Sequence, residues 1–256
     1  MRLARARTAD GVVSGAYDDG TIRTDDGATY AVGDGDATLL APCEPSACFC
    51  VGRNYAATLD QMDYDVPDAP DWFVKPPASV HPPDAPVPYP AWTGELTYAG
   101  ELAAVIDRRC RDVPVDEVDD VVRGYTLLND LDALDQPGRT ARKAFDASAP
   151  LGPWIETDVD PADLAMTTHV GGELRQEAST ARMLFEPREV ISFLSRRYTF
   201  RPGDVVSFGS PANPGLVEPG EAVVIEYEGV GTLRNRIVAP DEGRSDGSSP
   251  HGPKDD

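Results

Sequence analysis

The sequence is poor in lysine, cysteine and histidine, and it has no long hydrophobic run. Only three of its 23 basic residues are lysines (Lys75, Lys143 and Lys254), against 44 acidic residues, so the formal net charge is −21. Nucleic-acid binding needs a basic footprint, so we expect no nucleic-acid partner. No run of about 18 apolar residues occurs, so we expect no transmembrane helix and no membrane partner.

The four cysteines and three histidines show no metal-binding spacing. Cys48 and Cys50 are one residue apart in the apolar stretch ACFCVG, which is the wrong spacing for a zinc knuckle. We therefore expect buried free thiols. The N-terminal stretch MRLARARTADG has basic residues but no apolar core. A secretory signal is thus not expected, and the sequence favours a cytoplasmic protein.

The negative charge is spread along the whole chain rather than gathered in a tail. Such a surface repels itself at low salt and is screened at molar salt. The composition therefore indicates a halophilic protein, adapted to a salt-rich cytoplasm. This describes the habitat of the protein and leaves its function open.

The chain divides into three segments by composition. Residues 1–42 hold short β-like runs broken by Asp-Gly turns, which predict hairpins in a small N-terminal β domain. Residues 45–239 predict strands with a few helices, so the expected class is α+β, mostly β. Residues 240–256 are polar, acidic and rich in Gly, Pro and Ser, which predicts a disordered tail.

Two segments predict helices inside the larger domain. The spacing of apolar residues over 115–124 favours a helix with Asp112 as its cap. The stretch EPREVISFLSRR, 186–197, is more clearly amphipathic, with Pro187 near its start.

The stretch TYAGELAAVIDR, 97–108, predicts a strand that is apolar on both faces and therefore buried on both sides. Glu101 is the exception, because a buried carboxylate is costly unless it is paired. The sequence leaves open whether a protein cation, a metal ion or nothing pairs with this carboxylate.

Several short stretches combine polar residues, glycines and prolines in patterns that burial in a core alone does not explain. In chain order they are CVGRNYA (50–56), FVKPP (73–77), TYAGEL (97–102), GYTLLNDLDALD (124–135), RKAFDASAPLGPW (142–154), GGELRQEAST (171–180) and GDVVSFGSP (203–211). In order and spacing this set resembles the fumarylacetoacetate hydrolase family, whose patterns include GRNYxxH, ExEL, NDxSARD and KSFDxxxPxGP. The resemblance is to its short acylpyruvate hydrolase and oxaloacetate decarboxylase-like members, and it covers residues 45–239.

The resemblance implies a mixed β-roll, a homodimer and a divalent metal, Mg²⁺ or Mn²⁺, bound by carboxylates. The matching metal ligands are Glu101 and Asp130, and the matching catalytic lysine is Lys143. The matching substrate-binding positions are Arg53, Lys75, Gln176 and Ser210. Such a metal would chelate a small keto acid and stabilise the enolate formed in hydrolysis, decarboxylation or isomerisation.

The chain departs from the family pattern at the expected site. Ala99 stands where the pattern has a metal-binding Glu, and Thr58 and Gln61 stand where it has a His–Glu pair that activates water. Leu134 replaces an arginine, and Asp132 replaces a serine. We therefore expect weak or absent metal binding and weakened hydrolysis.

Three explanations stay open. The chain is an enzyme that works with a two-carboxylate metal site in a reaction without activated water, such as decarboxylation or keto–enol isomerisation, or it is a non-catalytic paralogue that binds a small acid or a partner subunit. In the third, Asp132 rebuilds the metal site.

Overall fold

The computed structural model describes residues 1–33, 35–212 and 215–241. The predicted tail therefore lies outside the described residues from position 242 onward. Among the described residues no helix is long and apolar enough to cross a membrane.

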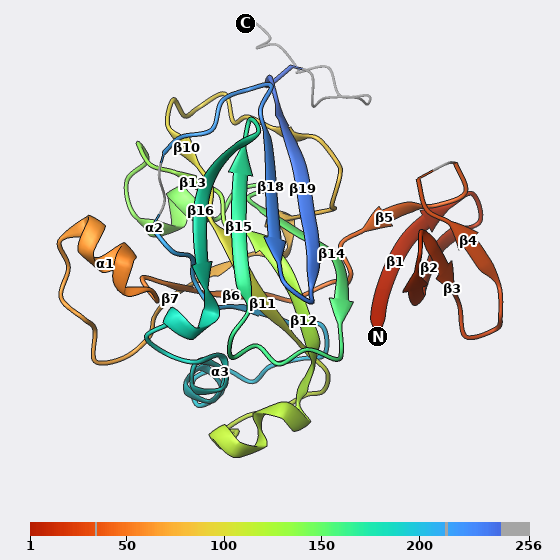
Figure 1. Ribbon diagram of the computed structural model, residues 1–256, viewed down its shortest axis with the longest axis horizontal. Helices are drawn as coiled ribbons and strands as arrows, with labels where there is room; N and C mark the ends of the chain where they lie inside the picture. Colours follow the sequence, from red (N-terminus) through yellow and green to blue (C-terminus); the bar gives the residue numbers. More distant parts are fainter. Residues whose placement is uncertain (34, 213–214, 242–256) are drawn as a thin grey trace, which may run out of the picture.

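The N-terminal strands are β1 (Arg2–Thr8), β2 (Gly11–Asp18), β3 (Thr21–Arg23), β4 (Thr29–Ala31) and β5 (Thr38–Leu40). The Asp-Gly turns of the sequence join β1 to β2 and β2 to β3 as antiparallel hairpins. These strands pack around their own small apolar cluster, which includes Ala6, Ile22 and Leu39. Figure 1 shows them as a lobe beside the main body.

The remaining strands are β6 (Cys48–Gly52), β7 (Asp71–Lys75), β8 (Val80–His81), β9 (Val87–Pro88), β10 (Leu96–Thr97), β11 (Gly100–Ile106), β12 (Val122–Asn129), β13 (Asp132–Ala133), β14 (Ala149–Glu156), β15 (Ala165–Val170), β16 (Glu173–Ser179), β17 (Val205–Ser207), β18 (Ala222–Tyr227) and β19 (Gly231–Val238). The α-helices are α1 (Ala56–Met62), α2 (Arg139–Lys143) and α3 (Pro187–Ser195). Short 3-10 helices span Pro77–Ser79, Val115–Asp120 and Thr180–Arg182.

Within the described residues, twelve strands form one sheet whose main order is β4-β3-β2-β1-β14-β12-β11-β17-β6-β7. A second sheet of five strands has the order β16-β15-β18-β19-β9, and β10 pairs with β13. The fold is thus α+β and mostly β, as the sequence predicts. The lobe joins the large sheet where β1 pairs with β14.

Strand β11 lies at the centre of this arrangement, and all seven of its residues are buried. One face packs through Leu102, Ala104 and Ile106 into the main core, which also contains residues of β15, β18 and α3. The other face packs through Ala103 and Val105 against a smaller core. The predicted two-sided burial of this strand is confirmed.

The two predicted helices have different outcomes. Helix α3 forms as predicted, with a capping box between Glu186 and Glu189 and Pro187 in its first turn. The segment 115–124 does not form an α-helix, because only Val118 of its 3-10 turn is buried and β12 begins at Val122. Asp112 is not its cap, since Pro114 takes that position and Asp112 has a φ of +51°.

Candidate active site

Neighbouring strands bring the predicted acidic residues together. In the antiparallel pairing of β11 with β12, Gly100 lies opposite Asn129. Asp130 follows β12 directly, and its backbone N–H donates to the carbonyl of Ala99 over 2.9 Å. Glu101 and Asp130 therefore face one cavity, together with Lys143.

Glu101 is only 2% exposed. Its Oε2 accepts a hydrogen bond from the backbone N–H of Gly209 over 3.2 Å. Gly209 has a φ of +84°, and a Cβ there would lie 3.0 Å from Asn54, so this close approach of the backbone favours glycine. Burial, followed by the charge of Asp130, raises the pKa of Glu101 to about 8. Near neutral pH this carboxyl group therefore carries a proton for most of the time.

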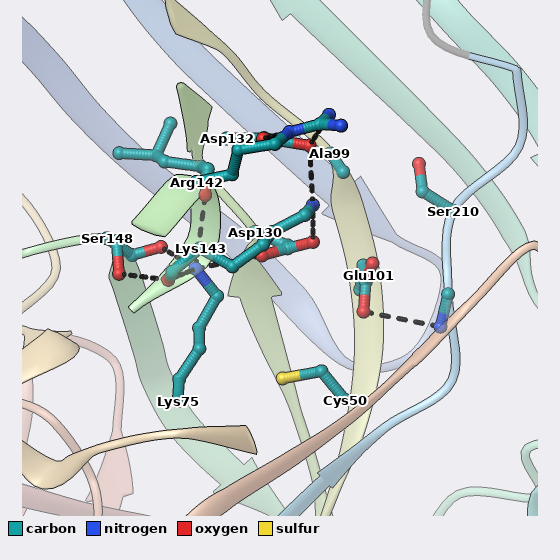
Figure 2. Close-up of polar contacts among 12 residues, drawn as sticks. Cys50, Lys75, Ala99, Glu101, Asp130, Asp132, Arg142, Lys143, Ser148 and Ser210 are labelled. Carbon is teal, nitrogen blue, oxygen red and sulfur yellow. Dashed lines mark hydrogen bonds and ion pairs between the residues drawn. The ribbon is translucent and has the colours of Figure 1, made fainter. Parts of the chain in front are cut away.

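Asp130 lies between two ammonium groups (Figure 2). Its Oδ1 is 2.9 Å from Nζ of Lys75, and its Oδ2 accepts a short hydrogen bond from Nζ of Lys143. Burial alone would raise the pKa of Asp130, but Lys143 and Lys75 outweigh it, so the pKa is lowered. Asp130 is therefore the ionised member of the Glu101–Asp130 pair.

Asp132 is also paired with cations. Arg142 binds it in a bidentate manner, with Nε at 2.8 Å from Oδ1 and Nη2 at 2.6 Å from Oδ2. Nζ of Lys143 lies 3.2 Å from the same Oδ2. Burial lowers the pKa of Lys143, but Asp130 and Asp132 outweigh that effect and the pKa is raised. Lys143 is therefore a fixed ammonium group between two carboxylates.

The acidic residues open onto a cavity of about 660 Å³. Its described lining includes four basic side chains, Arg53, Arg139, Arg142 and Lys143, and three acidic ones, Glu101, Asp130 and Asp132. With Glu101 protonated, the positive charge in the lining exceeds the negative charge. In a protein with a net charge of −21, this cavity is suited to a small anion.

A second group of charges stands at the same cavity. Arg139 binds Asp71 through two hydrogen bonds of 2.6 Å, and Nε of Arg53 lies 3.5 Å from the same carboxylate. The guanidinium of Arg53 also lies over the ring of Tyr64. Two arginines thus share one carboxylate, which leaves one positive charge uncompensated within this group.

Ser210 and Gln176 form a buried hydrogen-bonded tie. Nε2 of Gln176 donates to Oγ of Ser210 over 2.7 Å and to the carbonyl of Pro211 over 3.0 Å. Its Oε1 accepts from the backbone N–H of Gly100 over 3.1 Å. Ser210 lines the cavity, whereas Gln176 lies behind it and holds the serine in place.

Two of the residues predicted to bind substrate lie outside the cavity lining, Lys75 and Gln176. Lys75 is fully buried, and its ammonium donates to the carbonyls of Leu131, Lys143 and Ser148 besides pairing with Asp130. Neither Lys75 nor Gln176 lines the cavity, because protein oxygens already saturate their donors. Both residues position the groups that do line it. Arg53 and Ser210 do line the cavity.

Sequence reasoning missed Arg139 and Arg142. Both lie on α2, in the stretch RTARK, with the spacing that brings residues i, i+3 and i+4 to one side of a helix. Because Lys143 was already a candidate, this helical spacing could have indicated that the two arginines lie beside it. Asp71, the partner of Arg139, is 68 positions away, so no local pattern could have shown the pair.

The departures from the family pattern all fall at the cavity. Its lining includes Thr58, Gln61, Ala99 and Leu134. Oγ1 of Thr58 donates to the carbonyl of Ser210 over 2.9 Å, and a hydroxyl group is no base near neutral pH. None of these four side chains can activate water by taking its proton.

The chain belongs to the fumarylacetoacetate hydrolase family. The family model described as "Fumarylacetoacetate (FAA) hydrolase C-terminal" matches residues 47–238. This range agrees with the extent of the motifs in the sequence.

The most informative similarities are to three proteins. A 5-carboxymethyl-2-hydroxymuconate delta-isomerase from Mycobacterium smegmatis has 37% identity and a TM-score of 0.86, covering 93% of this chain and 99% of that one. Oxaloacetate tautomerase FAHD1 of Bos taurus is 34% identical over 75% of this chain and 91% of its own length. Maleylpyruvate hydrolase from Sphingobium sp. SYK-6, solved with manganese(II) and pyruvate, has 28% identity and a TM-score of 0.80, covering 93% and 99%.

The residues of this chain do not fit a resident divalent metal. Within the described ranges no group of three or more His, Cys, Asp or Glu residues is arranged to hold an ion. Ala99 supplies no ligand atom, and Arg142 already binds both carboxylate oxygens of Asp132. Both oxygens of Asp130 already face ammonium groups. The predicted ligands Glu101 and Asp130 are therefore close together, but they are not arranged as an open metal site.

Proposed function

We propose that this chain binds a small keto acid in the cavity and catalyses its keto–enol isomerisation or decarboxylation, with little hydrolysis. The observation that carries the proposal is that a fixed ammonium group, Lys143, and a buried carboxyl group, Glu101, line the same cavity. The names of the relatives, which include an isomerase and a tautomerase, support the same reaction class.

The charges of the cavity favour a substrate with one or two carboxylates. The Arg53–Arg139–Asp71 group has one positive charge in excess, and Lys143 adds an N–H donor deeper in the cavity. A keto acid presents a carboxylate at one end and a carbonyl oxygen beside it. The carboxylate can bind the guanidinium groups of Arg53 and Arg139, and the carbonyl oxygen can accept a hydrogen bond from the ammonium group of Lys143.

Isomerisation and decarboxylation need few groups. Each passes through an enolate, whose negative oxygen is stabilised by a cation held in place beforehand. Lys143 is such a cation, since Asp130 and Asp132 fix it. Glu101, with a pKa of about 8, can give and take a proton near neutral pH, as keto–enol exchange requires. Neither reaction needs an activated water.

The test measures three reactions with one preparation in high-salt buffer. Keto–enol exchange and decarboxylation are followed with oxaloacetate, and hydrolysis with an acylpyruvate, each against the uncatalysed rate. We expect acceleration of the first or second reaction and little of the third. Lys143→Met should lower that acceleration about 10²–10³-fold, as loss of one enolate-stabilising donor does, while Lys143→Arg should retain more of it. Hydrolysis with a turnover of about 1–10³ s⁻¹ would overturn the proposal.

A non-catalytic binding protein is the second candidate. It is favoured by a specific observation: the cavity lining includes four departures from the family pattern, none with a side chain that can take a proton from water, namely Thr58, Gln61, Ala99 and Leu134. This candidate predicts keto-acid binding by calorimetry without acceleration of any of the three reactions.

A further inference from the structure

Five charged side chains form an alternating row from the interior to the cavity. The order is Lys75, Asp130, Lys143, Asp132 and Arg142, and each neighbouring pair is in ion-pair contact (Figure 2). The inner end is fixed, because Lys75 also donates to three backbone carbonyls. The outer end is fixed by the bidentate contact of Arg142.

Lys143 stands at the centre of this row with donor capacity left. An ammonium group has three N–H donors. Its contacts with Asp130 and Asp132 use two of them, and the side chain lines the cavity. The remaining donor can therefore serve a ligand oxygen.

A divalent ion would compete with this row. To reach Asp130 it would have to displace Lys143, and to recruit Asp132 it would have to displace Arg142. Ala99 provides no compensating ligand. Mg²⁺ gives up its water molecules reluctantly, so a site that must first be cleared of two cations binds it poorly.

We propose that Lys143, held by Asp130 and the Asp132–Arg142 pair, replaces a divalent metal as the cation that binds the ligand's oxygen atoms. Ligand binding in this chain is then independent of divalent metals. The inference rests on the proposed function for the class of ligand, a small keto acid. Asp132 and Arg142 are positioning residues, because they act through Lys143.

The first experiment uses the unaltered protein in high salt. The ligand is oxalate, a planar dianion that resembles the enolate of pyruvate. Its affinity is measured by isothermal titration calorimetry, first with excess EDTA and then with excess Mn²⁺ in place of EDTA. The second measurement is corrected for the oxalate that Mn²⁺ binds in solution. Direct Mn²⁺ binding is followed by electron paramagnetic resonance without oxalate. We expect the same oxalate affinity in both buffers and no binding of Mn²⁺.

The outcomes separate the inference from the proposed function. Oxalate binding only with Mn²⁺, or direct binding of Mn²⁺ to the unaltered protein, overturns the inference and leaves the proposed function standing. Absence of binding by oxalate, oxaloacetate and pyruvate in both buffers overturns the proposed function and the inference with it.

Two sets of variants test the residues. Lys143→Met should weaken oxalate binding about 10–100-fold in EDTA, whereas Lys143→Arg should weaken it less. The double variant Ala99→Glu/Asp132→Ser adds a carboxylate and removes one of the two ion pairs that hold Lys143, so Mn²⁺ should displace Lys143 from Asp130 and bind where the unaltered protein does not bind it. The single variant Asp132→Ser is its matched control and should not gain the metal. Equal oxalate affinity for Lys143→Met and the unaltered protein overturns the inference.

Discussion

At the scale of single residues, Glu101 explains what a carboxyl group does inside a strand that is buried on both faces. It keeps its proton, because burial and the neighbouring Asp130 raise its pKa to about 8. Its Oε2 still accepts one hydrogen bond, from Gly209. The free-energy cost of burying Glu101 depends on pH, so it can be measured.

We predict that Glu101→Gln stabilises the protein increasingly as pH rises. The pKa of Glu101 is raised above its ordinary value of 4.5, so the folded state holds its proton while the unfolded state loses it. The unaltered protein therefore loses stability between pH 4.5 and about 8, by about 1.4 kcal/mol for each unit of pKa difference. Glutamine imitates the protonated carboxyl group and avoids that loss.

Chemical denaturation at several pH values checks this. The difference in free energy of unfolding between Glu101→Gln and the unaltered protein should grow from pH 4.5 to about 8 and then level off. A difference that stays constant, or that shrinks with rising pH, would show that Glu101 is ionised in the folded state.

Other residue roles could not be predicted from the sequence. Lys75 matches a substrate-binding position of the family pattern, yet it binds carbonyls 56, 68 and 73 positions away along the chain. Such contacts leave no periodic or local signal. Glu101 could be singled out, because one carboxylate in an apolar alternation is visible from the sequence alone.

At the scale of elements, the sequence predicts best where several local signals agree. Helix α3 has an amphipathic pattern, a proline in its first turn and a capping box, and it forms as predicted. The segment 115–124 has the apolar spacing, but its predicted cap, Asp112, is not used, because Pro114 takes that position and makes no side-chain cap; the segment forms a 3-10 turn followed by β12. Spacing without capping was therefore insufficient.

Helix α1 carries the two positions at which the family pattern has a His–Glu pair that activates water. It carries Thr58 and Gln61 at i and i+3, and both residues line the cavity. Thr58→His/Gln61→Glu should place a base and its orienting carboxylate on this helix. We predict that hydrolysis of an acylpyruvate rises by about 10²-fold or more in this double variant, as expected for a general base.

The measurement is the acylpyruvate hydrolysis rate as a function of pH. The rate of Thr58→His/Gln61→Glu should rise with an apparent pKa in the range of histidine, and oxaloacetate isomerisation should change little. The variant Thr58→Gln/Gln61→Glu, which has no imidazole, is the control. Equal hydrolysis rates for the two double variants would show that a group outside α1 limits the reaction.

The turn after β6 is held by Asn54, which is fully buried. Its side chain donates to the carbonyls of Phe185 and Phe208 and accepts from the N–H of Phe185, each over 2.9 Å. We predict that Asn54→Ala lowers the free energy of unfolding by about 2–4 kcal/mol, since it leaves buried backbone groups unpaired. Urea denaturation checks this, and a loss below about 0.5 kcal/mol would contradict it.

At the scale of the whole molecule, the arrangement of sheets was predictable only through the resemblance to a family. Local patterns predict single strands and hairpins, but they do not indicate that β17 pairs with β11 on one side and β6 on the other. That pairing brings Ser210 to the cavity and the N–H of Gly209 to Glu101. The charge balance of the cavity was also hidden, because its basic and acidic side chains come from distant segments.

The net charge of −21 comes from acidic residues spread along the whole chain. The distance over which charges are screened falls from about 10 Å at 0.1 M salt to about 3 Å at 1 M, so repulsion between acidic residues should fade over this range. We predict that Tm rises as KCl is raised into the molar range, by about 2–4 °C for each kcal/mol gained. Salt also strengthens apolar burial in any protein, so a control is needed. Asp116→Asn/Glu117→Gln/Asp120→Asn removes three exposed negative charges from one surface segment, and its Tm should rise less steeply with KCl. A Tm that does not change with KCl would refute the halophilic interpretation, and equal slopes for the two proteins would assign the rise to apolar burial.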